Sequence, residues 1–187
     1  MKFLKLDTYE EAIKKIEGSV SFELKSEEIP ISSSLNRILS EDLISPINVP
    51  GYPKSQMDGY AVRSEDTFEA SETSPVKLKL IESVNAGSAP RYPIKNNTCS
   101  YVATGAPVPE GADSVVMIEN TQLQGNFITL NRGVAPGENI MKLGYDIKKG
   151  NHILPKNTLI TPRIVGLLSG LGIKKVKVYK KLKIGIF

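Results

Sequence analysis

Residues 55–63 read Ser-Gln-Met-Asp-Gly-Tyr-Ala-Val-Arg, and this stretch sets a carboxylate between two kinds of backbone. The prolines upstream, at positions 46, 50 and 53, fix their own φ and favour extended conformations in the residues before them. Asp58-Gly59 is a turn dipeptide, and Tyr60-Ala61-Val62 is typical of a short strand. The stretch therefore predicts an aspartate at a rigid corner, which is either a plain hairpin turn or a functional loop.

Short strands dominate the middle of the chain. Alternating or β-branched runs predict strands over 59–63, 76–83, 99–103, 114–118 and 126–130, with turn signals rich in Gly, Pro and Asn between them. This spacing favours a small all-β unit. Two further strands are expected outside it, over 20–24 and from Lys183 to the last residue.

Helices are expected near both ends of the chain. Residues 8–17 carry an apolar stripe, and Thr8 with Glu11 can form a capping box at its start. A second short helix is expected after the serines at 32–34, with its apolar side chains between 35 and 43. A third begins at Pro162 after the capping Thr161, and we expect its apolar stripe to share a subdomain with that of the first helix.

Composition is ordinary for a soluble globular protein: 187 residues, 40% hydrophobic and 24% charged. A single cysteine, Cys99, excludes an internal disulfide and a thiolate zinc cluster. No apolar run reaches the ~20 residues that a membrane span requires, and the first residues are too short an apolar stretch for a signal peptide. We therefore expect a cytoplasmic protein without a membrane partner.

The positive charge is concentrated in one segment. Six lysines and no acidic residue lie between positions 174 and 183, and removing them would change the formal net charge from +4 to −2. Valines alternate with lysines there, which is typical of a strand with one solvated face rather than of a nucleic-acid surface. Aromatic residues are nearly absent among them, so we expect no nucleic-acid partner.

Three later segments strengthen the functional interpretation of Asp58. Residues 104–117 read Thr-Gly-Ala-Pro-Val-Pro-Glu-Gly-Ala-Asp-Ser-Val-Val-Met; residues 136–140 read Pro-Gly-Glu-Asn-Ile; and residues 144–150 read Gly-Tyr-Asp-Ile-Lys-Lys-Gly. Together with residues 55–63, and in this order, they resemble the molybdopterin molybdotransferase family, the MoeA and gephyrin E-domain proteins. The resemblance extends over essentially the whole chain.

The resemblance implies an α+β, β-rich fold with two subdomains. Residues 1–45 and 138–187 would form one elongated, discontinuous α/β subdomain that leads into a further α/β domain missing here. Residues 46–137 would form a small all-β subdomain inserted into it. The strand beginning at Lys183 fits this expectation, since a buried strand with nothing after it is an unusual end for a domain.

The family also implies a reaction. Its members insert molybdate into adenylylated molybdopterin, with cleavage of the nucleotide and a requirement for Mg²⁺, a hard cation that prefers oxygen ligands. The resemblance assigns catalytic roles to Asp58, Thr104 and Asp146, with Asp58 also as the metal ligand. Read without it, the Thr104 hydroxyl would satisfy a turn and Asp146 would bond to its own turn backbone.

Residues around these motifs are the expected cofactor-binding groups: Met57, Gly59, Tyr60, Gly105, Glu119 and Lys142. Lys142 stands where the family usually has arginine, so it keeps the charge but loses the bidentate fork. Glu119 could face the cleft or be a solvated strand end. The resemblance further implies a homodimer, with a molybdopterin-adenylating protein as a possible partner.

On this interpretation the chain is the N-terminal portion of an enzyme, a molybdopterin molybdenumtransferase, and is inactive alone because the opposite wall of the cleft lies in the missing domains. The rival hypothesis is a non-catalytic scaffold of the gephyrin type that binds receptor segments. A weaker one is a nucleic-acid binder that uses the lysines at 174–183.

Overall fold

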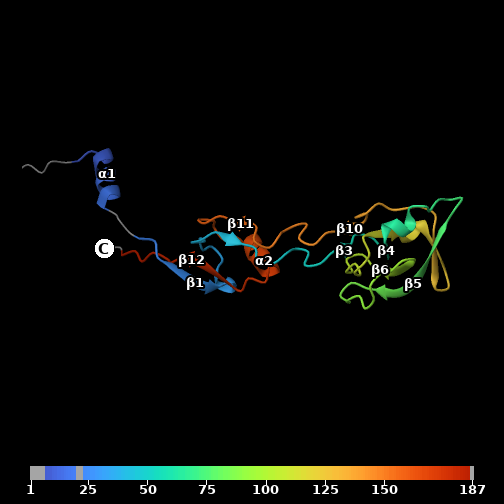
Figure 1. Cartoon of the computed structure of the whole chain (residues 1–187). Coiled ribbons are helices and arrows are strands. Elements are labelled where there is room, and N and C mark those ends of the chain that lie inside the picture. Colours follow the sequence, from blue (N-terminus) through green and yellow to red (C-terminus); the bar gives the residue numbers. More distant parts are fainter. Residues whose placement is uncertain (1–6, 20–22, 186–187) are drawn as a thin grey trace, which may run out of the picture. The chain divides into compact units, whose positions relative to one another are not determined.

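A computed structural model describes residues 7–19 and 23–185 (Figure 1). The described residues divide into two compact units, one from Met1–Leu43 with Leu154–Phe187 and one from Ile44–Ile153. β2 (Leu43–Ile44) pairs with β11 (His152–Leu154). We refer to the discontinuous unit as unit 1 and to the other as unit 2.

Unit 2 is built on a six-stranded sheet. Its strands are β4 (Gly59–Val62), β5 (Val76–Val84), β6 (Thr98–Val102), β7 (Ser114–Met117), β8 (Thr121–Gln124) and β9 (Phe127–Leu130). The order across the sheet is β7-β4-β6-β5-β9-β8, with β5 and β6 parallel and every other pair antiparallel. All five strands predicted for this region are present; β8 was not expected, because its sequence Thr-Gln-Leu-Gln is polar and it lies at the sheet edge.

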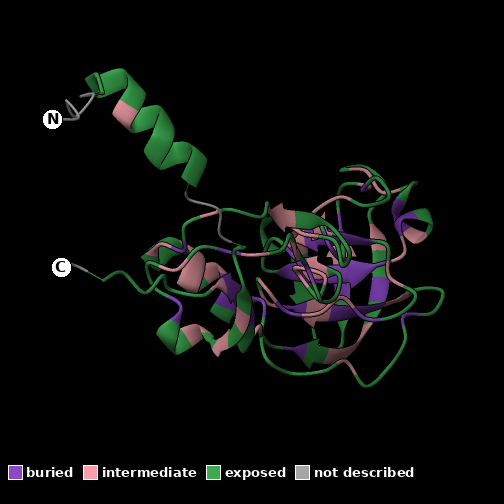
Figure 2. Ribbon diagram, turned by 90° about the vertical axis from the view of Figure 1, so that its left-hand side faces the viewer, coloured by how far each residue is buried: buried purple, intermediate pink, exposed green. Residues whose placement is uncertain are grey.

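Buried side chains gather on this sheet, as the purple strands in Figure 2 show. One cluster contains Leu78, Ile128 and Leu130, and a second contains Ala61, Val102 and Val115. All six side chains are fully buried. Because β4 is buried along its whole length, it is a central strand whose backbone is fixed on both sides. The site described below begins at its first residue.

Two short elements complete the part of unit 2 that carries the site. β3 (Lys54–Ser55) pairs antiparallel with β10 (Ile140–Met141), and Val49 pairs with Ile147. These pairings hold residues 138–153 in unit 2, whereas the family resemblance implies a subdomain boundary at 138. The physical reason is that this segment forms backbone hydrogen bonds with the proline-rich segment before Asp58.

Unit 1 contains a two-stranded antiparallel ladder of β1 (Ser26–Pro30) and β12 (Lys175–Tyr179) with α2 (Pro162–Gly170). Its core contains Leu39, Ile160, Leu168, Val176 and Val178. The expected alternation of β12 is confirmed, since Val176 and Val178 are buried while Lys175 and Lys177 are exposed. Both lysines form ion pairs, Lys175 with Glu28 and Lys177 with Glu41, so the basic segment is partly neutralised by unit 1 itself.

The first helix is confirmed, and the second is not. α1 spans Tyr9–Ser19, and the capping box forms as expected: Thr8 N donates to Glu11 Oε2 at 3.0 Å and Glu11 N to Thr8 Oγ1 at 3.2 Å. None of its residues is buried, and Figure 2 shows it almost entirely green, so the burial expected for its stripe is not seen. The serines at 32–34 overlap a 3-10 turn, η1 (Ile31–Ser33), and no helix follows it over 35–43, because Ile38 and Leu39 enter β-bridges with Leu159 and Val178 instead.

The remaining elements are short. They are the 3-10 turns η2 (Ser64–Thr67) and η3 (Ile118–Asn120). The strand expected over 20–24 falls largely outside the described residues; the one expected from Lys183 is absent over 183–185, and its last two residues also fall outside. Within the described ranges, no helix combines the length and apolarity needed to cross a membrane. The α+β, β-rich fold class is confirmed.

Candidate active site

Asp58 lies at a corner between two different ladders. It follows β3, which pairs with β10, and precedes β4, which pairs with β6 and β7. The two strands around it do not pair with each other, so the residue is not the tip of a hairpin. Its side chain is exposed. The structure therefore favours a presented carboxylate over a plain hairpin turn.

Thr104 holds this carboxylate through two hydrogen bonds to the same oxygen. Its backbone N donates to Asp58 Oδ1 at 2.6 Å and its Oγ1 donates to Oδ1 at 2.8 Å. The backbone N–H, followed by the hydroxyl, holds the pKa of Asp58 below its ordinary value of 3.8 because both bonds stabilise the charged form. Oδ2 receives no hydrogen bond from the described residues, so one carboxylate oxygen is left to a ligand.

Backbone hydrogen bonds through Ser55 and Gln56 join three of the motif segments. Ser55 N donates to Ala106 O at 2.9 Å, and Gly105 N donates back to Ser55 O at 2.9 Å. Gln56 N donates to Asn139 O, also at 2.9 Å, and ties in the segment at 136–140. The buried Ser55 hydroxyl donates to Met57 O at 2.5 Å, which fixes the turn that leads to Asp58. The motifs are thus adjacent in space although far apart in sequence.

A cavity of about 380 Å³ opens beside Thr104. Its lining residues are Lys54, Ser55, Gln56, Met57, Thr104, Gly105 and Met141. Met57 and Gly105 were expected at the site; Lys54 and Met141 were missed. The available signal for Lys54 was alternation: in β3 the side chain of Ser55 is buried, so that of its neighbour points the other way.

Gly59 and Tyr60 have packing roles in the structure, and the cofactor contacts expected of them stay predictions. A Cβ on Gly59 would lie 2.1 Å from Val116 O and 2.9 Å from Val115 Cγ1, so glycine is required for β4 to approach β7. The Tyr60 ring is 6% exposed and packs edge-on against Tyr101, with ring centroids 5.8 Å apart. Burial raises the pKa of its hydroxyl. The ring therefore belongs to the core of unit 2.

Glu119 and Asp146 are both exposed and are placed differently. Glu119 lies in η3, next to Ile118, whose N donates to Asp58 O at 3.2 Å, so its backbone is close to the corner. Asp146 is held by its own N, which donates to Val49 O at 2.9 Å. In the described part of the chain no hydrogen bond or shared cavity joins the Asp146 carboxylate to Asp58 or Thr104. Its carboxylate also makes no turn bond there, and its catalytic role stays a prediction.

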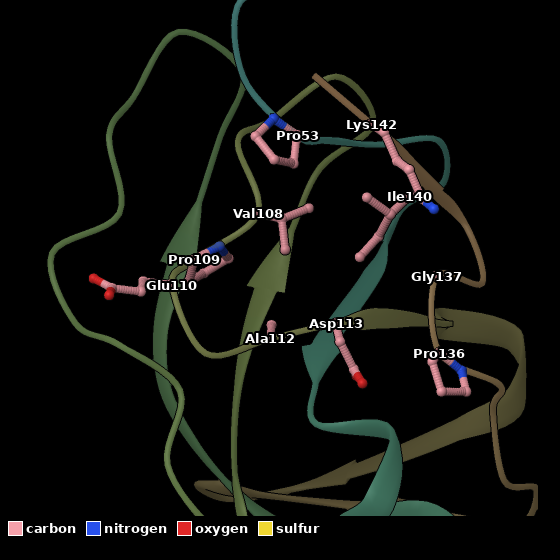
Figure 3. A pocket seen from close by; sticks show the side chains of 10 residues that line it. All are labelled: Pro53, Val108, Pro109, Glu110, Ala112, Asp113, Pro136, Gly137, Ile140 and Lys142. Atoms are coloured by element: carbon pink, nitrogen blue, oxygen red, sulfur yellow. The ribbon is translucent and has the colours of Figure 1, made fainter. Parts of the chain in front are cut away.

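Lys142 lies in a separate cavity of about 580 Å³ (Figure 3). Prolines 53, 109 and 136 line it, and Figure 3 shows Glu110 and Lys142 on opposite sides. It shares no lining residue with the Thr104 cavity. The cation that lines the Thr104 cavity is Lys54, and the cofactor-binding role of Lys142 stays a prediction. Asp113, at the same cavity, accepts from Ser64 N and Ser64 Oγ at 2.7 Å each and is structural.

The donor set around Asp58 fits a hard cation only in part. Among residues 7–19 and 23–185, no three His, Cys, Asp or Glu side chains converge as a metal cage. Mg²⁺, however, is commonly bound by one or two carboxylates together with water and substrate phosphates. The free Oδ2 of Asp58 fits such a shared site.

The fold and the site together define a class of protein: a two-unit α+β region whose exposed Asp–Thr pair comes from two motifs far apart in the sequence. Residues 7–172 match the family model described as the MoeA N-terminal region (domain I and II), and the chain belongs to this family. A molybdopterin molybdenumtransferase of Bacillus subtilis is 39% identical over 166 residues, which cover 87% of this chain and 39% of that protein. One from Haemophilus influenzae is 36% identical over 180 residues, covering 96% and 43%.

A solved structure agrees with these relatives. The crystal structure of a molybdopterin biosynthesis MoeA protein from Pyrococcus horikoshii matches with a TM-score of 0.86 and 40% sequence identity, over 95% of this chain and 45% of that one. The chain thus spans about two fifths of the length of these relatives.

Proposed function

We propose that this chain is the N-terminal portion of a molybdopterin molybdotransferase, which inserts molybdate into adenylylated molybdopterin and releases AMP. The observation that carries the proposal is the Asp58–Thr104 pair, with one carboxylate oxygen held by two hydrogen bonds and the other left to a ligand. The names of the relatives support it. The chain then supplies one wall of the active cleft, and turnover requires the remaining domains and a partner subunit of a homodimer.

Asp58 Oδ2 would hold Mg²⁺ in the assembled enzyme, and the ion would supply charge neutralisation at the substrate phosphates. Thr104 would keep Asp58 ionised and oriented, because both of its donors act on the charged form. Since its hydroxyl proton is donated to Asp58, Thr104 offers lone pairs to a bound water or ligand donor. It is thus a positioning residue and an acceptor.

The test joins this chain to the C-terminal remainder of the Bacillus subtilis relative and measures molybdenum insertion with Mg²⁺, molybdate and adenylylated molybdopterin. Asp58→Asn is the sharpest variant, because the amide oxygen can still accept both bonds from Thr104 while the charge is lost. We expect a fall in rate of about 100-fold or more, the range found when an electrostatic group is removed from an active site.

The control is Glu72→Gln, which removes an exposed carboxylate from the same unit and should leave the rate unchanged. Thermal unfolding of both variants should match the parent. If the fusion is inactive, or if folded Asp58→Asn keeps the parent rate, the proposed function is wrong for this chain.

A further inference from the structure

Lys54 is a half-buried cation without an acceptor among the described residues, and it lines the cavity beside Thr104. Its strand neighbour Ser55 is buried and hydrogen-bonded, which fixes the backbone on which the lysine stands. Lys54 also pairs with Met141 on one side and bridges Pro107 on the other. The long side chain of Lys54 is thus attached to rigid backbone at the wall of the cavity.

The other donors around this cavity are already used. The backbone N–H groups of Ser55, Gln56, Met57, Thr104 and Gly105 all donate to protein acceptors. The hydroxyls of Ser55 and Thr104 donate to Met57 O and to Asp58. In the described part of the chain, the side-chain donors left for a ligand are the Lys54 ammonium and the Gln56 amide.

Charge then decides what this cavity can hold. Asp58 does not line the cavity, but it is bonded to the lining residue Thr104, and its free oxygen suits a cation and by itself repels an anion. Lys54 supplies the opposite charge and three donors in one compact group, which suits phosphate-like oxygens. Within the cavity itself the lining charge is therefore that of Lys54, which favours an anion, while the free oxygen of the neighbouring Asp58 favours a cation.

We infer that Lys54 binds a tetrahedral oxyanion, a phosphate ester or molybdate, in the Thr104 cavity and determines its affinity. This inference rests on the proposed function, because both anions belong to that reaction. It assigns the anion to Lys54 and not to Lys142, which lines the other cavity.

The test is an NMR titration of this chain with inorganic phosphate and, separately, with molybdate, in EDTA so that no metal occupies Asp58. The Thr104 and Gly105 amides report on the cavity. We expect Lys54→Gln to weaken binding about tenfold, equivalent to about 1.4 kcal/mol, and Lys54→Arg to retain it. The matched control is Lys77→Gln, an exposed lysine of β5 in the same unit, and its affinity should stay within about twofold of the parent.

If only phosphate shifts the amides and the shift depends on Lys54, the Lys54 ammonium binds the phosphate ester. If only molybdate does so, the ammonium binds molybdate. Either result supports the inference. It is overturned if neither anion shifts these amides, or if Lys54→Gln binds like the parent or no worse than Lys77→Gln. The titration needs no turnover, so it stands or falls separately from the Asp58→Asn assay. If Asp58→Asn abolishes insertion while Lys54→Gln leaves anion binding unchanged, this inference alone is wrong.

Discussion

Replacing Gly59 with alanine tests whether the first residue of β4 is glycine for packing. The added Cβ would lie 2.1 Å from Val116 O and 2.9 Å from Val115 Cγ1, about 1 Å inside the ordinary limit for the first contact. The oxygen belongs to the backbone of β7, which is itself paired with β4, so it cannot rotate away. Relief requires β4 and β7 to separate and the ladder between them to weaken.

Overpacking of this kind costs about 1–3 kcal/mol, and more where backbone must move, so we expect about 3 kcal/mol for Gly59→Ala. A domain of ~100 residues loses about 4–8 °C per kcal/mol, so its melting temperature should fall by about 12–24 °C. Circular dichroism during thermal and urea unfolding measures both quantities.

Gly51→Ala is the matched control, because its Cβ would meet only Asn48 O, at 3.9 Å, and its φ is not in the left-handed region. Its stability should stay within about 0.5 kcal/mol of the parent, as for other surface changes. If Gly59→Ala unfolds at the same temperature as Gly51→Ala, the strand-approach explanation is wrong and a ligand-contacting role for this glycine returns.

Two further predictions concern the carboxylates. Thr104→Ala should raise the pKa of Asp58 but leave it below 3.8, because the backbone N–H of residue 104, the larger cause of the shift, remains. A ¹³C-detected titration of the carboxyl group measures this pKa, and an unchanged value would contradict the prediction. Since the folded pKa is depressed, the stability that Asp58 contributes is present above its unfolded pKa and is lost as pH falls through the folded pKa. Asp113→Ala should lower the free energy of unfolding, measured in urea, by about 1–3 kcal/mol, because the N–H and hydroxyl of the 2% exposed Ser64 lose their acceptor. Asp113→Asn should lower it less. Equal losses for the two variants would argue against hydrogen bonding as the cause.

Features that depend on nearby residues could be predicted from the sequence. The Thr8–Glu11 capping box and the buried valines of β12 follow from neighbours three or four residues apart, or from strict alternation. The corner at Asp58 follows from prolines and a turn dipeptide close to it in the chain. Such features need no knowledge of distant segments, so they could be predicted.

Where the conformation of a segment depends on contacts with distant residues, the sequence pattern did not predict it. The apolar residues between 35 and 43 suit a helix, but bridges to Leu159 and Val178, which lie far along the chain, draw them into extended structure. Tyr60 looks like a site residue beside Asp58, yet pleating turns its ring into the core against Tyr101.

The site itself shows the same division. Sequence determined that Asp58 and Thr104 are polar groups at turns, and the resemblance paired them. Only the tertiary structure decided that both Thr104 donors bond to one oxygen of Asp58, that Gly59 lets β4 approach β7, and that Lys54, not Lys142, lines the Thr104 cavity. The physical reason is that these outcomes depend on which backbone groups pair across the fold, and such pairing depends on the packing of the whole unit rather than on any local pattern.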